Sequence, residues 1–359
     1  MFDKKTIRDI DIKDQIVLVR TDYNVPLKEG KVADDLRIRE SLPTIEHLLQ
    51  HSVAKIVIMS HLGRPEGKKS PELSLQPVAE TLQKLLPKTE VKFVSEVSGP
   101  EVEMTLAEVP EGGILMLENL RFYPEETENS EDFMREIVDS THAGIFVQDG
   151  FAVLHRKHAS TDAIINILPS VAGLLVEKEV TTLTKVREQP DHPLALIIGG
   201  AKGEDKQHLI EQFTDADQII VGGKIAADGY QSNLPNIYVA EDFDEDTTGA
   251  KLDIGPVSTA KIAELLTPAK TIIWNGALGK VEDPTYATSS LIIAQEIGKK
   301  PDITSVICGG DTTAFVRQVQ KHKPELKYTL ISTGGGASLE LLLGKNLPGL
   351  SRLQSKLDR

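Results

Sequence analysis

The sequence predicts an α/β protein built from two doubly wound, mostly parallel sheets of the Rossmann-like kind, which form two lobes joined by a long helix. Short apolar runs alternate with helical patterns along the whole chain, as parallel strands with helical crossovers do. A length of 359 residues favours two domains over one. One amphipathic stretch, Leu168–Gln189, separates the two halves and predicts the linking helix.

The first half contains five apolar runs that predict strands and three amphipathic stretches that predict helices. The strands are expected at Gln15–Arg20, Lys55–Met59, Val91–Val94, Gly113–Leu117 and Gly144–Val147, and the helices at Asp35–Gln50, Leu75–Leu86 and Glu131–Thr141.

The expected domain limits follow from proline and glycine positions. Residues 1–168 form the first lobe, and residues 169–189 form a linking helix that Pro190 and Pro193 close. Residues 190–345 form the second lobe. Residues 346–359 contain the Pro348-Gly349 pair and are expected to return to the first lobe. A rigid helical linker suits two lobes that move as bodies.

In the second half, apolar strands end repeatedly in glycine turns. These strand-and-turn runs are Leu194–Gly200, Gln218–Gly223, Thr271–Gly276, Ser305–Gly310 and Thr329–Gly336. Free backbone N–H groups at such turns, together with the helix that follows, favour an anion such as phosphate. The alternative is that glycine serves only the backbone conformation of the turn. The chain contains neither a P-loop motif nor a dinucleotide fingerprint.

Composition narrows the function classes. The formal net charge is −14, which argues against binding to nucleic acid or to an anionic membrane. A single cysteine, Cys308, excludes an intrachain disulfide and a cysteine metal cluster. The first residues lack the apolar core of a signal peptide, and no apolar run approaches membrane-spanning length. We therefore expect a cytoplasmic protein that acts on small molecules.

Polar residues follow the predicted strands of the first half. Because ligands bind outside the carboxyl ends of strands in open α/β sheets, these residues should converge on one edge. They are Asp22, Asn24, His61, Arg64, Arg121 and Arg156, with Arg37 near the start of the first helix. An arginine cluster in an acidic chain suits a small molecule with carboxylate and phosphate groups. The alternative is a set of surface salt bridges. His61 and His155 could serve as general bases, although a hydrogen-bonded contact with substrate fits them better.

Charged residues also follow the glycine turns of the second half. Lys202, Asp205 and Lys206 lie after the first of these turns, Glu282 after the third, and Asp311, Thr312 and Thr313 after the fourth. A carboxylate beside bound phosphate holds Mg²⁺, often through waters, and a lysine contributes a point charge. A two-lobed kinase that closes on two anionic substrates across a cleft follows from these two sets.

Several blocks of the chain resemble the phosphoglycerate kinase family, in the family's order from Val17 almost to the C-terminus. They are VLVRTDYNVPLKEGKVADDLRIRESLPTI, SHLGRP, LENLRFYPEE, HRKHAST, IIGGAKGEDK, WNG, GGDTTA and ISTGGGASLELLLGK. The resemblance implies reversible phosphoryl transfer in glycolysis and gluconeogenesis, between 1,3-bisphosphoglycerate and MgADP, giving 3-phosphoglycerate and MgATP. It also implies a monomer.

The resemblance carries functional roles onto matching positions. The residues that would bind 3-phosphoglycerate are Asp22, Tyr23, Asn24, Arg37, His61, Leu62, Gly63, Arg64, Arg121 and Arg156. The residues that would bind ADP or ATP are Gly200, Ala201, Lys206, Asn275, Glu282 (through the ribose), Gly309, Gly310, Asp311 and Thr312. Asp311 is also the expected Mg²⁺ residue. The expected catalytic residues, which stabilise the phosphoryl group in transfer, are Arg37, Lys202, Gly335 and Gly336.

The departures from the family pattern concentrate around the nucleotide base. The chain is shorter than the family between Asp228 and Ile237, and lysines stand at Lys224, Lys251 and Lys280. One hypothesis is a weak, less base-selective nucleotide site, or another phosphate carrier such as pyrophosphate or polyphosphate. The plainer interpretation is that these lysines face solvent.

A non-catalytic protein that only binds 3-phosphoglycerate is the alternative from another functional class. Such a sensor has no need of Lys202, Lys206 or Asp311, and the retention of these residues argues for an enzyme.

Overall fold

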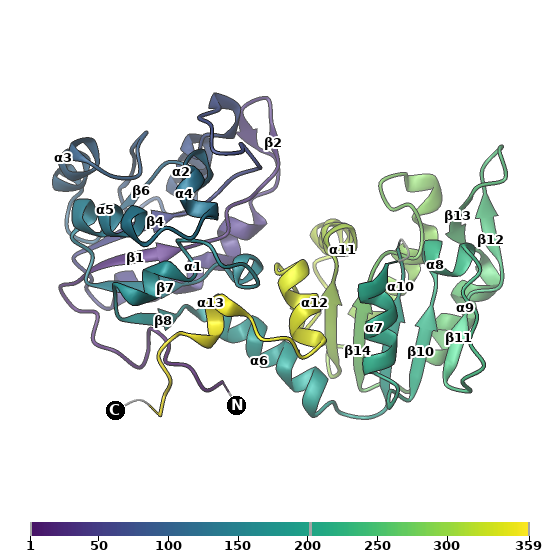
Figure 1. The fold of residues 1–359 in the computed structure, drawn as a ribbon. Coiled ribbons are helices and arrows are strands. Elements are labelled where there is room, and N and C mark those ends of the chain that lie inside the picture. The colour runs from purple at the N-terminus through teal and green to yellow at the C-terminus, as the bar shows by residue number, and fades with distance from the viewer. Residues whose placement is uncertain (1, 201–202, 358–359) are drawn as a thin grey trace. The chain divides into compact units, whose positions relative to one another are not determined.

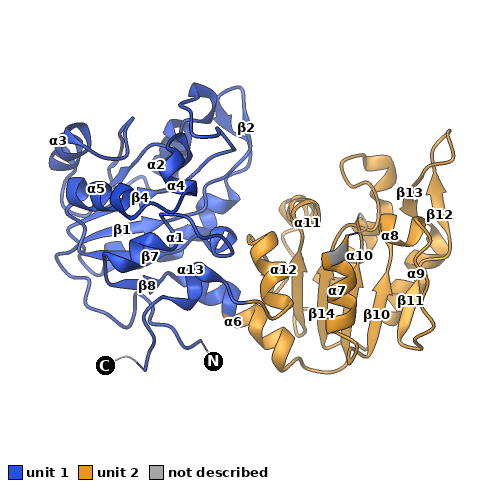
Figure 2. Ribbon diagram, in the orientation of Figure 1, with its two compact units in different colours: residues 1–180, 346–359 blue, residues 181–345 orange. Residues whose placement is uncertain are grey.

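The computed structural model describes residues 2–200 and 203–357, and the chain divides into two compact units. Unit 1 comprises Met1–Val180 and Asn346–Arg359, and unit 2 comprises Thr181–Lys345 (Figure 2). Helix α6 (Leu174–Glu188) contributes residues to both units. The predicted fold class, two parallel α/β sheets, is confirmed.

Unit 1 is organised around a six-stranded parallel sheet in the order β5-β6-β4-β1-β7-β8 (Figure 1). Its strands are β1 (Ile16–Arg20), β4 (Lys55–Met59), β5 (Val91–Phe93), β6 (Gly113–Met116), β7 (Ile145–Gln148) and β8 (Ser170–Ala172). The chain builds one side of the sheet from β1 and then returns to add β7 on the other side. The carboxyl end of β1 therefore lies at the topological switch point, where open α/β sheets bind ligands.

Helices cover both faces of this sheet because both faces are apolar. Val17 and Val19 of β1 pack into one core cluster, and Leu18 between them packs into the other. The first cluster includes residues of α1 (Leu36–Gln50) and α2 (Gln76–Leu85). The second includes residues of α3 (Pro100–Glu108) and α5 (Glu131–Thr141). A strand buried on both faces reads as a continuous apolar run, which is why the sequence reveals it.

Unit 2 repeats the arrangement with a six-stranded parallel sheet in the order β11-β10-β9-β14-β15-β16 (Figure 1). Its strands are β9 (Leu194–Ile198), β10 (Gln218–Val221), β11 (Ile237–Val239), β14 (Thr271–Asn275), β15 (Thr304–Cys308) and β16 (Leu330–Ile331). Its helices are α7 (Glu204–Gln212), α8 (Gly223–Ala227), α9 (Pro256–Leu265), α10 (Thr288–Gly298), α11 (Gly310–His322) and α12 (Gly336–Leu342). Its switch point lies between β9 and β14.

The predicted linking helix starts later than expected. The residues after Pro169 form β8, which pairs with β7, and α6 begins only at Leu174. The apolar spacing of Val171, Leu174 and Leu175 fits both a helix and a short buried strand, and the open pairing edge of β7 selects the strand.

Several further elements were not predicted, and most of them are short. They are β8, β11, helix α3, helix α4 (Pro124–Thr127), and the hairpins β2–β3 (Leu27–Lys28, Lys31–Val32) and β12–β13 (Phe243–Glu245, Lys251–Ile254). The C-terminal segment contains α13 (Pro348–Ser351) and pairs Ser355 with Lys4 of unit 1. No helix in the described part of the chain combines the length and apolar character that crossing a bilayer requires.

Candidate active site

The first group of site residues in unit 1 gathers where β1 ends. Asp22 forms an ion pair with Arg37, which lies in the first turn of α1. The backbone N–H of Asn24 donates to Oδ1 of Asp22 at 3.2 Å. The strand end and the start of the next helix are thus joined through Asp22, which contacts both Arg37 and the backbone of Asn24.

His61, at the end of β4, lies against the same carboxylate. Its Nδ1 is 3.9 Å from Oδ1 of Asp22 and 3.1 Å from Nη2 of the buried Arg20. Burial is the largest cause that lowers the pKa of His61 well below its ordinary value, and the nearby guanidinium groups of Arg20, Arg121 and Arg37 lower it further. The imidazole is therefore neutral at physiological pH.

Gly63 connects the two halves of the unit 1 site. Its backbone N–H donates to Oδ1 of Asn24 at 2.9 Å, and its carbonyl accepts from Nη1 of Arg121 at 2.8 Å. Its φ is +64°, and a Cβ there would lie 2.8 Å from the side chain of Leu73. Glycine is required here because an L side chain would be strained and crowded.

Three arginines and a histidine line one pocket of about 510 Å³ in unit 1. They are Arg64, Arg121, Arg156 and His158. Burial lowers the pKa of Arg121 to about 10, with Arg20 and Arg156 acting in the same direction. Nε of Arg121 is buried and finds no hydrogen-bond partner among the described residues. A buried guanidinium N–H without a partner, among other positive charges, marks a place for an anion.

Tyr23 and Leu62 are placed differently from the other predicted substrate residues. The Tyr23 side chain is 0% exposed and its phenol hydrogen-bonds to Oγ of Ser41 at 2.7 Å. Leu62 is 2% exposed, and its backbone N–H and C=O bond to the Asn119 side chain. These two side chains support the site from the core rather than line it.

Residues that sequence reasoning missed lie directly beneath the site. Arg20 ends β1 and is 0% exposed, as is Glu126 of α4, which lies 3.8 Å from Nη2 of Arg20. Ser160 bonds to both. Burial raises the pKa of Glu126, which the positive charge of Arg20 opposes. The signal in the sequence was a charged residue closing an apolar run, but its partner stands far along the chain.

In unit 2, the glycine turns meet at the switch point of the sheet. A Cβ at Gly276 would lie 2.2 Å from the carbonyl oxygen of Gly199, so these two turns touch backbone to backbone. Glycine is therefore needed at this contact because the two backbones approach closely, a reason separate from phosphate binding. At Gly310, by contrast, a Cβ would meet no atom of the described residues within 4 Å, which leaves the backbone there accessible.

Lys206 extends from α7 to the contact between the Gly199 and Gly276 turns. Its Nζ donates to the carbonyl oxygen of Gly199. Burial lowers the pKa of Lys206, and the negative charge of Asp311 opposes that effect. The lysine and the aspartate, which lie on different helices, are therefore close enough to influence each other, as the prediction of a phosphate site with Mg²⁺ requires.

The start of α11 supplies further candidate groups. Gly309 precedes it with φ +88°, a conformation that favours glycine, and Asp311 lies exposed in the first turn. Oγ1 of Thr312 is buried without a hydrogen-bond partner in the described part of the chain. A Cβ at Gly309 would lie 3.6 Å from Oγ1 of Thr312 and 3.7 Å from Oδ1 of Asn275, so these polar atoms share one corner.

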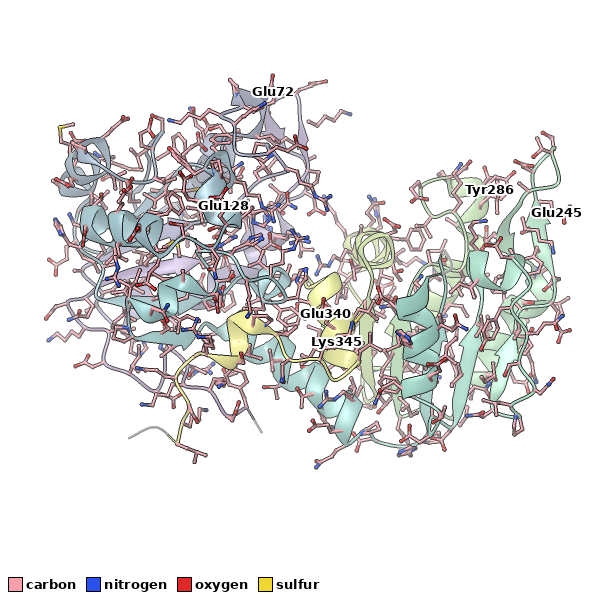
Figure 3. The ribbon with its side chains drawn as sticks, viewed as in Figure 1. Glu72, Glu128, Glu245, Tyr286, Glu340 and Lys345 are labelled. Carbon is pink, nitrogen blue, oxygen red and sulfur yellow. The ribbon has the colours of Figure 1, made fainter. Side chains whose placement is uncertain are left out.

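Glu282 and Asp311 line one pocket of about 550 Å³ between the 281–291 segment and α11. Its walls are mainly apolar and include Leu291 and Phe315. Tyr286, labelled in Figure 3, lies in the turn that borders it. The pocket thus places the two predicted ribose and Mg²⁺ carboxylates together.

Two predicted residues, Ala201 and Lys202, lie outside the described residues. The triple-glycine turn joins β16 to α12, and Gly335 has φ +51° and precedes Gly336, the first residue of that helix. The N–H of Gly334 donates to Oγ of Ser332 at 3.1 Å.

The three lysines that depart from the family pattern are exposed, as the plainer interpretation expects. Nζ of Lys224 lies 2.9 Å from Oδ1 of Asp228, and Nζ of Lys251 lies 4.5 Å from the centre of the Phe243 ring. Two of the three charges therefore already interact within the chain.

The residues present suit a magnesium ion that takes only some of its ligands from the protein. No group of three or more His, Cys, Asp or Glu side chains within residues 2–200 and 203–357 could hold a metal ion. Asp311 provides one carboxylate in the first turn of α11, next to the glycine turn at Gly309. Mg²⁺ commonly takes one or two carboxylates and completes its shell with waters and substrate phosphates, so the fit is good.

Comparison with known proteins indicates one family for this chain. The family model described as phosphoglycerate kinase matches residues 7–237 and 227–345. The two matched segments overlap at residues 227–237, which is where the chain was expected to be shorter than the family.

Curated relatives and solved structures give the same result. The phosphoglycerate kinases of Moorella thermoacetica and Fervidobacterium nodosum are each 39% identical and cover 98% and 99% of this chain, and 100% and 99% of their own lengths. The alignment with the first spans 399 positions, although this chain has 359 residues, so part of that relative has no counterpart here. The Coxiella burnetii enzyme structure matches with a TM-score of 0.78 at 32% identity, and that of Pyrococcus horikoshii with 0.85 at 27%, each over 98% of both chains.

Proposed function

This chain belongs to the phosphoglycerate kinase family of phosphotransferases, and we propose that its unit 1 binds 3-phosphoglycerate while its unit 2 binds the Mg²⁺ complex of ADP or ATP. The observation that carries the proposal is the convergence of Arg64, Arg121 and Arg156 on one pocket of an acidic chain. The ion pair of Arg37 with Asp22 extends the same site.

The two ends of the acid substrate need different partners. A phosphate group suits the arginine pocket because guanidinium groups make paired, charged hydrogen bonds to phosphate oxygens. A carboxylate suits the region of Asn24, Arg37 and His61, whose N–H groups are donors. We assign both binding roles on this chemical basis.

In the direction that consumes ATP, a carboxylate oxygen of 3-phosphoglycerate forms a bond to the terminal phosphorus of ATP. The bond from that phosphorus to the bridging oxygen breaks, and ADP leaves with the electron pair. Positive charge near the transferred group stabilises such a transition state. Arg37, Lys202 and the backbone of Gly335 and Gly336 are the groups we assign to that stabilisation.

The nucleotide residues form the second part of the proposal. Lys206 supplies a positive charge for the phosphates, and backbone N–H groups at Gly200, Ala201, Gly309 and Gly310 and the hydroxyl of Thr312 supply donors. Asn275 and Glu282 contact the rest of the nucleotide. Asp311 would hold Mg²⁺, which when bound neutralises phosphate charge.

We propose further that the enzyme acts as a monomer in the cytoplasm on these small molecules alone. The acidic composition, which is unsuited to nucleic acid or anionic membranes, supports the restriction to small molecules. A different phosphate donor gains little support, because Lys224 and Lys251 already have partners in the chain.

Titration calorimetry with the full chain tests the division of roles. 3-Phosphoglycerate should bind to the wild type and lose affinity in Arg64→Gln, while MgADP binds both proteins equally. Lys206→Ala should show the opposite pattern. Loss of both ligands in either variant, with the fold intact, would contradict the assignment of one ligand to each unit.

A further inference from the structure

The contact between Arg20 and His61 determines which nitrogen of the imidazole carries the proton, as well as where the imidazole lies. Nη2 of Arg20 lies 3.1 Å from Nδ1 of His61, and both side chains are buried. A guanidinium nitrogen can only donate a hydrogen bond, so Nδ1 must be the acceptor. An imidazole that accepts at Nδ1 carries its single proton on Nε2.

Arg20 has little freedom to leave this position. Its Nε donates to Oγ of Ser160 at 2.7 Å, and its Nη1 donates to the carbonyl oxygen of Thr21. The carboxylate of Glu126 lies 3.8 Å from Nη2 and also accepts from the backbone N–H and hydroxyl of Ser160, at 3.0 and 2.7 Å. Every guanidinium nitrogen thus has a partner, and the cation cannot rotate without losing one.

Nε2 of His61 is the free end of this arrangement. No hydrogen bond joins it to another of the described residues, whereas Nδ1 is occupied by Arg20. His61 lies at the strand end beside Asp22, in the region that we assign to the substrate carboxylate. The group it can offer there is an N–H donor.

We propose that Arg20 is a positioning residue that holds His61 as the neutral tautomer with its proton on Nε2, so that His61 meets the acid substrate as a hydrogen-bond donor. This inference rests on the proposed function of unit 1. It excludes His61 as a general base, because Nδ1 is taken and Nε2 is already protonated. The reaction needs no such base, since the substrate carboxylate has no proton to lose at neutral pH.

The charged surroundings keep His61 in this form across the working pH range. Asp22 alone would favour the imidazolium, but burial and several positive groups oppose it. The charged or titratable groups that face His61 are Arg20, Arg37, Arg121, His158 and Asp22. His158 is itself kept neutral near pH 7, because burial and neighbouring arginines lower its pKa to about 4.

The test is long-range proton–nitrogen NMR on the full-length wild type labelled with ¹⁵N-histidine, with the His61 signals assigned by their loss in His61→Gln. We expect an unprotonated Nδ1 and a protonated Nε2 from pH 6 to pH 8. A proton on Nδ1, or an imidazolium at pH 7, would overturn the proposal. This measurement needs no variant of Arg20 to fold.

The variant Arg20→Met then distinguishes control of the His61 tautomer by Arg20 from a purely structural role of Arg20. We expect the His61 tautomers to mix, a protonated form to appear by pH 6, and KM for 3-phosphoglycerate to rise at least tenfold and become pH-dependent. Arg135→Gln, which changes an exposed arginine paired with Glu131, is the control and should leave both readouts unchanged. Unaltered tautomer signals in a folded Arg20→Met would contradict the proposal. If the tautomer is as expected but the wild type does not bind 3-phosphoglycerate, the function assigned to unit 1 fails and the role of Arg20 as tautomer control stands.

Discussion

Oδ1 of Asp149 accepts a hydrogen bond from Oγ1 of Thr44 at 2.9 Å, and this bond ties the end of β7 to helix α1. Both side chains are 0% exposed. The same Oδ1 accepts from the N–H of Leu175 at 3.1 Å, and Oγ1 of Thr44 accepts from the N–H of Leu174 at 2.9 Å. The pair therefore caps the start of α6 and fixes it to α1, the helix that carries Arg37.

The buried carboxyl of Asp149 predicts an unusual pH dependence of stability. Burial raises its pKa from 3.8 to about 8, which the bonds from Thr44 and Leu175 only partly offset. Between roughly pH 4 and pH 8 the Asp149 carboxyl keeps a proton in the native state and releases it in the unfolded state. The contribution of this carboxyl to the free energy of unfolding is therefore lost as the pH rises toward 8. Asp149→Asn cannot ionise and keeps an oxygen for both donors.

We expect the free energy of unfolding of Asp149→Asn, relative to wild type, to increase from pH 5 to pH 8 by on the order of 4 kcal/mol. Urea denaturation at the two pH values measures it. Thr44→Val, which removes the hydroxyl but not the carboxyl, should be less stable than wild type at both, by about 1 kcal/mol. A difference between Asp149→Asn and wild type that does not change with pH would rule out the raised pKa.

Arg64 offers a clean test of the anion pocket because its side chain is exposed and lines that pocket. Arg64→Gln should raise Kd for 3-phosphoglycerate about ten- to a hundredfold, since a charged hydrogen bond contributes roughly 1.5–3 kcal/mol. Thermal stability should not change. Calorimetric titration measures the affinity, with Arg135→Gln as the matched control; equal affinity in Arg64→Gln and wild type would remove Arg64 from the site.

Lys206 tests the nucleotide half. Lys206→Ala should lower kcat/KM for MgATP at least about a hundredfold, because a partly buried ammonium beside the phosphates stabilises charge that water cannot reach. Initial rates at saturating 3-phosphoglycerate measure this. Lys299→Ala, an exposed lysine paired with Glu296, is the control. Rates within threefold of wild type in Lys206→Ala would place the phosphates elsewhere.

The lysines near the shortened segment should matter little. Lys224 is paired with Asp228 and Lys251 lies over Phe243, so neither needs a ligand to balance its charge. We expect Lys224→Ala and Lys251→Ala each to leave Kd for ADP within about twofold, because exposed pairs contribute little. Calorimetry with ADP, GDP and pyrophosphate checks this. A tenfold loss of pyrophosphate affinity in either variant would revive the idea of a different phosphate donor.

The sequence was sufficient to predict both sheets and most residues at their carboxyl ends. Strands such as β4 and β14 are buried on both faces and so appear as uninterrupted apolar runs. Parallel strands bring their carboxyl ends to one edge. There Gly63 links Asn24 to Arg121, and His61 lies against Asp22, which also accepts from the N–H of Asn24. The positions of these residues directly after apolar runs, together with the parallel order of the strands, are what made this part predictable.

The supports beneath the site could not be predicted in the same way. Arg20 and Glu126 are buried together, and neither local pattern shows that the two will meet. Three-residue strands such as β8 and β11 are also set by the edge of a neighbouring strand rather than by their own sequence. The buried pair and the short strands both depend on residues distant in the chain, which a local sequence pattern does not reveal.

The most direct test of the account is the initial rate of MgATP-dependent phosphorylation of 3-phosphoglycerate by the full chain, compared among wild type, Arg64→Gln and Lys206→Ala. The account predicts steady turnover by the wild type, a raised KM for 3-phosphoglycerate alone in Arg64→Gln, and a loss of rate in Lys206→Ala. A folded wild type that binds 3-phosphoglycerate but does not turn over with ATP, and whose rate neither substitution changes, would contradict it.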